Sequence, residues 1–116
     1  MRLAATLVLI AACARSTPSE GELVAEAQDE TRRFFALAEG GDCERLEPVM
    51  QLPAHCKDMV GEFKETHAHL LAIDDAKLDG RDKHVVLVTV QAQTTKELRH
   101  WIVRAKWTPG GWRLAL

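Results

Sequence analysis

The sequence contains no tyrosine, no excess of positive charge and no long apolar run at its start. The missing tyrosine removes one common general acid and oxyanion donor from any active site. With 15 basic and 17 acidic residues the formal net charge is −2, so no electrostatic feature predicts nucleic-acid binding, which needs a basic face. The apolar run at residues 3–12 covers ten residues, whereas a transmembrane helix needs about 20. The 116 residues allow one domain, and no catalytic or cofactor motif stands out, so no cofactor is expected.

Residues 3–12 have the length of the apolar core of a signal peptide, and a basic residue precedes them. The run ends in Ile10-Ala11-Ala12-Cys13, which resembles the bacterial lipobox, a motif whose cysteine becomes the lipidated N-terminus. The resemblance implies that residues 1–12 are a lipoprotein signal peptide that is removed. It also implies lipidation of Cys13, with residues 13–19 as a short polar tether. An ordinary secretory signal with a chance cysteine is the alternative.

The same resemblance implies a place in the cell. Acyl chains on Cys13 would hold the protein to a membrane. Ala14 follows the cysteine where an aspartate could stand, and by similarity to enterobacterial lipoproteins this favours the outer membrane. We therefore expect a lipid-anchored protein of the bacterial cell envelope, on the periplasmic side of the outer membrane.

The chain has three cysteines, and lipidation of Cys13 leaves Cys43 and Cys56. An exported chain enters an oxidising compartment, where paired thiols are usually bridged, so a disulfide between these two is expected. A crosslink closing so short a loop stabilises the fold by about 3 kcal/mol. The alternative is a metal site that uses both cysteines and His55, but no CxxC or HxxxH spacing accompanies them.

Three helical segments are expected in the first half of the domain. The first begins at Ser19 or Glu20, with an acidic first turn, and ends at the Gly40-Gly41 pair. The apolar residues that recur on one of its faces include Leu23, Ala27, Phe34 and Ala38. A short second helix is predicted at residues 43–47. The third starts near Pro53 and ends between residues 66 and 71.

The second half predicts a sheet of about four strands, at residues 72–78, 84–93, 98–107 and 111–116. Side chains of the third of these alternate between two faces. The row expected to face the core is Arg99, Trp101, Val103, Ala105 and Trp107. The opposite, mixed row is Leu98, His100, Ile102, Arg104 and Lys106. One dry face and one mixed face are typical of an antiparallel sheet covered on one side. The expected fold class is therefore α+β, with N-terminal helices packed on a curved sheet.

The order of these elements resembles the nuclear-transport-factor-2-like superfamily, a cystatin-like α+β cone. Its local motifs here are residues 34–42, the Asp79-Gly80 turn and residues 109–114 (PGGWRL). The resemblance covers residues 20–116. It implies helices resting in the concave face of a bent sheet, with a pocket at the open end of the cone. The residues expected at that pocket are Phe34, Phe63, Trp101, Val103 and Trp107.

Proton-shifting enzymes of that superfamily, such as its ketosteroid-isomerase-like members, use a pocket carboxylate as base. The local candidates are Asp74 and Asp75, with His100 nearby. Adjacent strand residues point to opposite faces, so at most one aspartate could enter the pocket, and solvated charges beside a turn are the stronger interpretation. His67 and His69 could pair on a strand, but their segment is predicted to be helical, so no metal site is expected.

These observations favour a non-enzymatic envelope lipoprotein whose domain binds an apolar small molecule or a protein partner. A homodimer through the exposed sheet face would use Leu98 and Ile102. A small isomerase or hydrolase with a pocket carboxylate is the alternative, and a structural or immunity-type lipoprotein is a third. A basic stripe on the sheet comprises Arg99, Arg104, Lys106 and Arg113. We expect it to be a solvated face, the exception being an acidic partner or a lipid head group.

Overall fold

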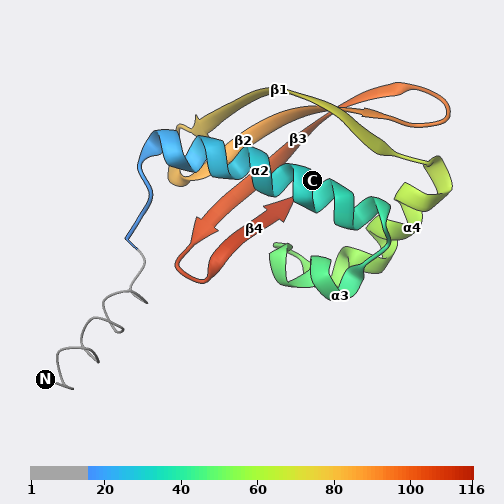
Figure 1. Cartoon of the computed structure of the whole chain (residues 1–116), viewed down its shortest axis with the longest axis horizontal. Coiled ribbons are helices and arrows are strands. Elements are labelled where there is room, and N and C mark those ends of the chain that lie inside the picture. Colours follow the sequence, from blue (N-terminus) through green and yellow to red (C-terminus); the bar gives the residue numbers. More distant parts are fainter. Residues whose placement is uncertain (1–15) are drawn as a thin grey trace, which may run out of the picture.

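The computed structural model describes residues 16–116. The signal peptide and the lipidated Cys13 predicted from the sequence lie outside these residues. The chain forms a layer of helices against an antiparallel sheet of four strands (Figure 1), so the predicted α+β class is confirmed. The helices are α2 (Glu20–Glu39), α3 (Cys43–Leu46) and α4 (Cys56–Thr66), with the single 3-10 turns η1 (Glu47–Val49) and η2 (Pro53–His55). The strands are β1 (His69–Asp79), β2 (Asp82–Gln93), β3 (Leu98–Thr108) and β4 (Gly111–Ala115).

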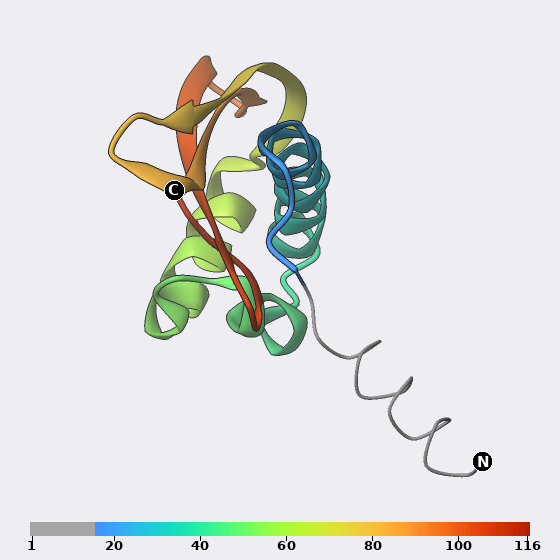
Figure 2. The ribbon, with the colours of Figure 1, turned by 90° about the vertical axis from the view of Figure 1, so that its left-hand side faces the viewer.

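Helix α2 lies along one side of the sheet (Figure 2). A capping box closes its start: the Ser19 hydroxyl accepts from the Glu22 backbone N–H, and the Glu22 carboxylate accepts from the Ser19 N–H. Hydrogen bonding to Ser19 lowers the pKa of Glu22. The helix ends at Gly40, and Gly41 follows with a φ of 70°, a conformation that glycine adopts readily. Its buried residues are Leu23, Ala27, Thr31, Phe34, Phe35 and Ala38, which include the apolar face predicted from the sequence.

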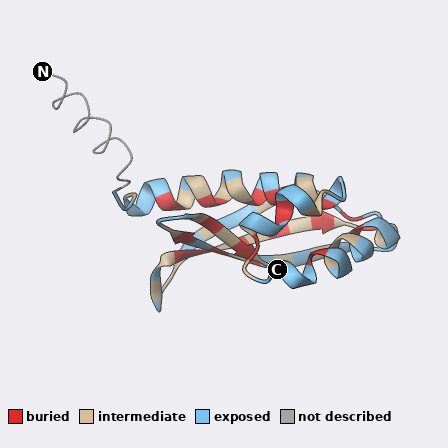
Figure 3. Cartoon of the chain, turned by 90° about the horizontal axis from the view of Figure 1, so that it is seen from below, coloured by how far each residue is buried: buried red, intermediate tan, exposed pale blue. Residues whose placement is uncertain are grey.

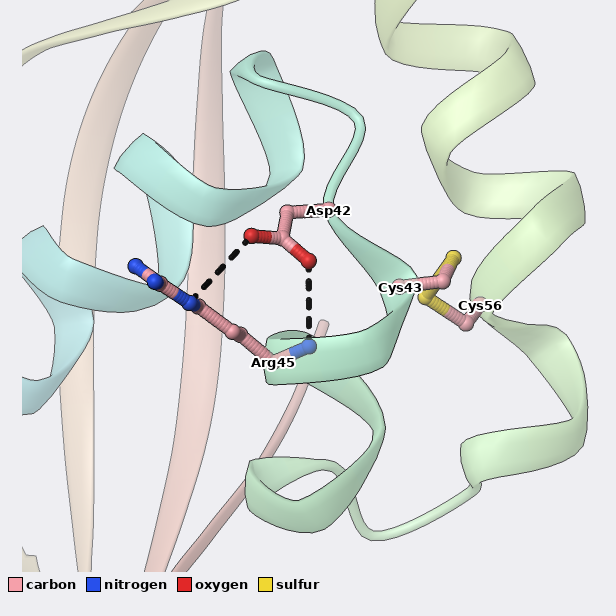
Figure 4. Close-up of a disulfide and its surroundings, with 4 residues drawn as sticks. All are labelled: Asp42, Cys43, Arg45 and Cys56. Carbon is pink, nitrogen blue, oxygen red and sulfur yellow. Dashed lines mark hydrogen bonds and ion pairs between the residues drawn. A yellow bond between two sulfur atoms is a disulfide. The ribbon is translucent and has the colours of Figure 1, made fainter.

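The predicted disulfide between Cys43 and Cys56 is confirmed, and it joins α3 to the first residue of α4 (Figure 4). The two Cα atoms are 5.9 Å apart. The Asp42 carboxylate accepts from the Arg45 backbone N–H at 3.1 Å and caps α3. The bridge therefore fixes the position of α4 relative to the end of α2.

Two helix boundaries differ from the prediction. The second helix ends at Leu46 as an α-helix and continues as the 3-10 turn η1, which contains Pro48. At Pro53 the chain forms only η2, and the α-helix begins at Cys56. Helix α4 then ends at Thr66, because His67 takes a left-handed conformation with a φ of 51°. The following residues are thus free to enter β1.

The sheet has the order β1-β2-β3-β4, with every pair antiparallel. Strand β1 is longer than the predicted residues 72–78, and its pairing with β2 is interrupted between Leu70 and Ala72 and again between Ile73 and Asp75. Each interruption inserts one extra residue, Leu71 or Asp74, as in a β-bulge. On the far side of the sheet, Met50 forms an isolated parallel bridge with Leu114, so this short segment covers the outer edge of β4.

The core lies between α2 and the inner face of the sheet, where buried residues of both layers face each other (Figure 3). The inner rows are the ones predicted from alternation. Their fully buried members are Val86, Val88, Val90, Ala92, Val103 and Ala105, each 0% exposed. Trp107, Trp112 and Leu114 complete the inner face. The core thus extends from Leu23 to Leu114 and the capping box begins at Ser19, so residues 16–116 include a folded unit with its own core.

Candidate functional site

The open part of the molecule lies beside β3, because β4 is much shorter than its neighbour. Pairing between the two strands ends at Arg104 and Ala115. The Gln51 N–H donates to the Leu114 carbonyl at 2.9 Å, so the Leu114 carbonyl points away from β3. Because such groups alternate in an antiparallel pair, Arg104 and Ala115 form the last hydrogen-bonded pair of the β3–β4 ladder.

The same alternation assigns the backbone groups of β3 beyond this pair. Those facing the open edge belong to Leu98, His100 and Ile102. No strand of the described residues lies beside them, and all three residues are exposed. We call this stretch, residues 98–103, the open half of β3. The stretch from Arg104 to Thr108, paired with β4, is the closed half.

An apolar groove runs along the open half, between the sheet and α4. It consists of two adjoining hollows of about 280 and about 170 Å³ that share Met59 and Leu116. The larger hollow reaches Phe63, Trp101 and Ile102. The smaller hollow continues toward η2 and β4, where its lining includes Phe34, Met50 and Leu52.

Three of the lining residues are large apolar side chains that remain open to solvent: Leu52 at 58%, Ile102 at 60% and Leu116 at 48% exposure. The floor is aromatic. The ring of Trp101 lies 6.0 Å from that of Phe35 in a stacked arrangement and 5.7 Å from that of Phe63. The groove therefore offers a preformed apolar surface that the fold itself leaves uncovered.

Charged groups form one rim of the groove. The Arg99 Nε atom lies 3.0 Å from Glu97 Oε1, and its Nη1 atom lies 3.9 Å from Glu62 Oε1 on α4. The sequence predicts that Arg99 shares a basic stripe with Arg104 and Lys106. Arg99 lies instead on the inner row, as the alternation predicts, and forms ion pairs with these two carboxylates.

The five predicted pocket residues separate into two groups. Phe34, Phe63 and Trp101 line the groove. Val103 and Trp107 belong to the core, where Trp107 packs against His84 with ring centroids 5.5 Å apart. Sequence reasoning missed Leu52, Met59 and Leu116. The one signal for them is the shortness of the final predicted strand, residues 111–116.

Both candidate catalytic aspartates are exposed, and neither belongs to the core. Asp75 pairs with Thr89, on the outer face. Asp74 is the extra residue of a bulge, and its carboxylate accepts from the Gln91 amide at 2.7 Å and lies 3.7 Å from His100 Nδ1. The expectation that the two aspartates point to opposite faces is therefore wrong, because the bulge interrupts the alternation. Neither carboxylate lines the groove.

The histidine pair is divided between two elements. His67 is the left-handed cap of α4, whereas His69 is the first residue of β1. Both line a broad, open hollow with Glu39 and Lys64, where the ends of α2 and α4 meet. Within residues 16–116, no three histidine, cysteine, aspartate or glutamate residues are close enough together to hold a metal ion.

No helix among the described residues is long and apolar enough to cross a membrane. Comparison of the chain with protein-family models, with curated proteins and with solved structures found no match.

Proposed function

We propose that this chain is a lipid-anchored protein of the bacterial cell envelope, held through Cys13 on the periplasmic side of the outer membrane. Its domain, residues 20–116, would be a nuclear-transport-factor-2-like, non-enzymatic binding module. The lipobox-like run before Cys13 supports the anchor. The disulfide between Cys43 and Cys56 supports an oxidising compartment. Helices packed against one face of a four-stranded antiparallel sheet are consistent with the superfamily.

The observation that carries the binding function is the apolar groove at the open half of β3. Its two hollows together reach the lower range of small-molecule sites, about 300–1,000 Å³, which are mostly apolar with a few polar groups. Leu52, Ile102 and Leu116 leave large apolar surfaces in water at the groove. Covering them would yield about 25 cal/mol for each Å² removed from water. We therefore propose an apolar small molecule as the ligand. Arg99 and Glu62 form the polar rim of the groove that would hold it.

Titration with an environment-sensitive apolar dye, N-phenylnaphthylamine, tests the groove. Ile102→Glu places a carboxylate on its wall. We expect dye affinity to fall by at least about ten-fold, because moving a charge out of water costs more than about 1.4 kcal/mol. Leu71→Glu is the matched control, since Leu71 is 52% exposed in the β1 bulge and does not line the groove. Equal dye affinity in both variants would exclude the groove as the site.

Sedimentation of the same two variants examines the expected homodimer. If a second copy covers Ile102, the wild-type domain sediments as a dimer and Ile102→Glu as a monomer with unchanged circular dichroism. A monomeric wild-type domain that binds the dye would assign the groove to a small molecule. A dimer whose dissociation restores dye binding would assign it to a protein partner.

Metabolic labelling with a fatty-acid analogue tests the anchor. The full chain, expressed in a Gram-negative bacterium, should take up the label, and Cys13→Ser should abolish it. A chain that is exported but unlabelled would instead be the product of an ordinary secretory signal. The isomerase or hydrolase alternative needed a buried carboxylate, and the exposure of Asp74 and Asp75 argues against it.

A further inference from the structure

One half of the outer sheet face is strongly basic. Four cationic side chains project from it, from β1, β3 and β4: Lys77, Arg104, Lys106 and Arg113. Among the described residues, none of the four has a carboxylate oxygen within 4.0 Å. We call these residues the basic face. Sequence reasoning found three of them. Lys77 joins the set only because β1 and β2 are in register beside β3.

The arrangement of the basic face costs stability within the domain. Lys106 and Arg113 are directly opposite each other on β3 and β4, and like charges in such a pair repel. Their hydrogen bonds go to neutral groups: Arg113 Nη1 donates to the Trp112 carbonyl at 2.9 Å, and Arg104 Nη1 lies 3.5 Å from Gln51 Oε1. Arg113 also lines a hollow with Glu26 and Glu30 of α2, but forms no ion pair with either. The fold thus gains no stability from concentrating these charges. A partner outside the domain would account for them.

The basic face lies at the end of the domain where the N-terminal segment arrives. The first residue of α2, Glu20, lines one shallow hollow with Asp79, Arg81 and Lys83 of the β1–β2 turn. The start of α2 and the turns that end β1 and β3 lie at the same end of the molecule (Figure 1; Figure 2). An extended stretch of seven residues, 13–19, reaches at most about 25 Å. A lipid on Cys13 would hold this end next to the membrane.

We infer that the basic face docks on the anionic lipid head groups of the membrane that carries the anchor. The inference rests on the lipid anchor proposed above, which supplies the location. The charge supplies the contact, because lipid phosphates would neutralise Lys106 and Arg113, which have no carboxylate oxygen within 4.0 Å among the described residues. Docked in this way, the domain turns α4 and the groove away from the lipid, since α4 lies at the opposite end of the molecule (Figure 1).

Vesicle sedimentation with the unlipidated domain, from Ser16 to Leu116, tests the contact separately from the anchor. We expect binding to vesicles containing phosphatidylglycerol, no binding to pure phosphatidylcholine, and loss of binding at high salt. Each basic residue near an anionic surface contributes about five-fold in binding. The double variant Lys106→Gln, Arg113→Gln should therefore bind up to about 25-fold more weakly.

The matched control is Lys57→Gln, Lys64→Gln, which removes the same charge from exposed positions on α4 and should bind like the wild type. If the first variant unfolds at a lower temperature, Lys77→Gln, Arg104→Gln replaces it. Equal loss in the control, equal binding to both lipids, or binding to heparin alone would overturn the inference. Because Cys13 is absent from this assay, such a result leaves the labelling experiment unaffected, and a failed labelling experiment leaves this assay interpretable.

Discussion

The two halves of β3 share one strand and one alternating pattern, yet they differ in pairing and burial. In the closed half, Ala105 and Trp107 are buried under α2, and β4 covers the edge. In the open half, Trp101 of the same inner row is only half-buried, and no strand of the described residues lies beside the edge. The difference comes from the length of β4, which has five residues against the eleven of β3. A strand that stops early thus creates a site without changing the strand next to it.

Helix α4 takes the place of β4 beside the open half. Where β4 is present, the sheet closes itself with help from Met50 and Gln51. Where β4 is absent, α4 supplies the opposing wall through Met59 and Phe63. Changes in the closed half should therefore lower stability, whereas changes in the open half should alter binding and leave stability almost unchanged.

The largest expected effect is on β4, which covers the edge of the closed half. Leu114→Ala removes a side chain that is 1% exposed, and such truncations cost about 4 kcal/mol in the free energy of unfolding. Leu116→Ala, two residues further on and 48% exposed, should change it by less than about 0.5 kcal/mol. Urea unfolding of both variants measures the contrast. Similar losses would mean that the two halves are not distinct.

The disulfide is the next largest contribution, because it secures the wall of the open half. Replacing both Cys43 and Cys56 by serine should lower the free energy of unfolding by about 3 kcal/mol and weaken dye binding in the folded protein. Titration of the unfolded, unreduced Ser16–Leu116 domain should find no free thiol. A variant with full dye affinity would show that α4 holds its place without the bridge.

A substitution at Gln51 tests the junction at Arg104, where the closed half of β3 begins. Its amide donates to the carbonyls of Arg104 and Arg113 at 3.1 and 3.3 Å, so Gln51→Ala should cost about 1 kcal/mol. Gln91→Ala is the control, since the Gln91 side-chain amide donates to the exposed Asp74, and we expect it to cost a few tenths of a kcal/mol. Thermal unfolding of the two variants distinguishes them. Equal shifts would mean that Gln51 contributes no more than a surface amide.

Much of the fold was predictable because periodicity reports burial. The alternation of Val86, Val88 and Val90, and of Val103 and Ala105, identified both inner rows. The helical spacing of Leu23, Ala27 and Phe34 likewise identified the buried face of α2, and the disulfide followed from counting cysteines. These features depend on local pattern, and local pattern is what a sequence displays.

The site was less predictable because it depends on where elements stop and shift. The extra residue Asp74 moved a carboxylate to the outer face, and the left-handed His67 ended α4 several residues before Leu71. The groove needs the end of β4 and the position of α4 together, and no single stretch of sequence encodes both. Lys77 joined the basic face for the same reason, through the register of three strands.

The bulges of β1 have a consequence for how copies of this protein tolerate crowding. Strand β1 is the long edge of the sheet, and a straight edge is a template on which another chain can add a strand. The extra residues Leu71 and Asp74 break the even spacing of its free N–H and C=O groups. Neighbouring molecules therefore meet an irregular border that cannot be extended into a continuous intermolecular sheet, which protects a concentrated population from fibrillar aggregation.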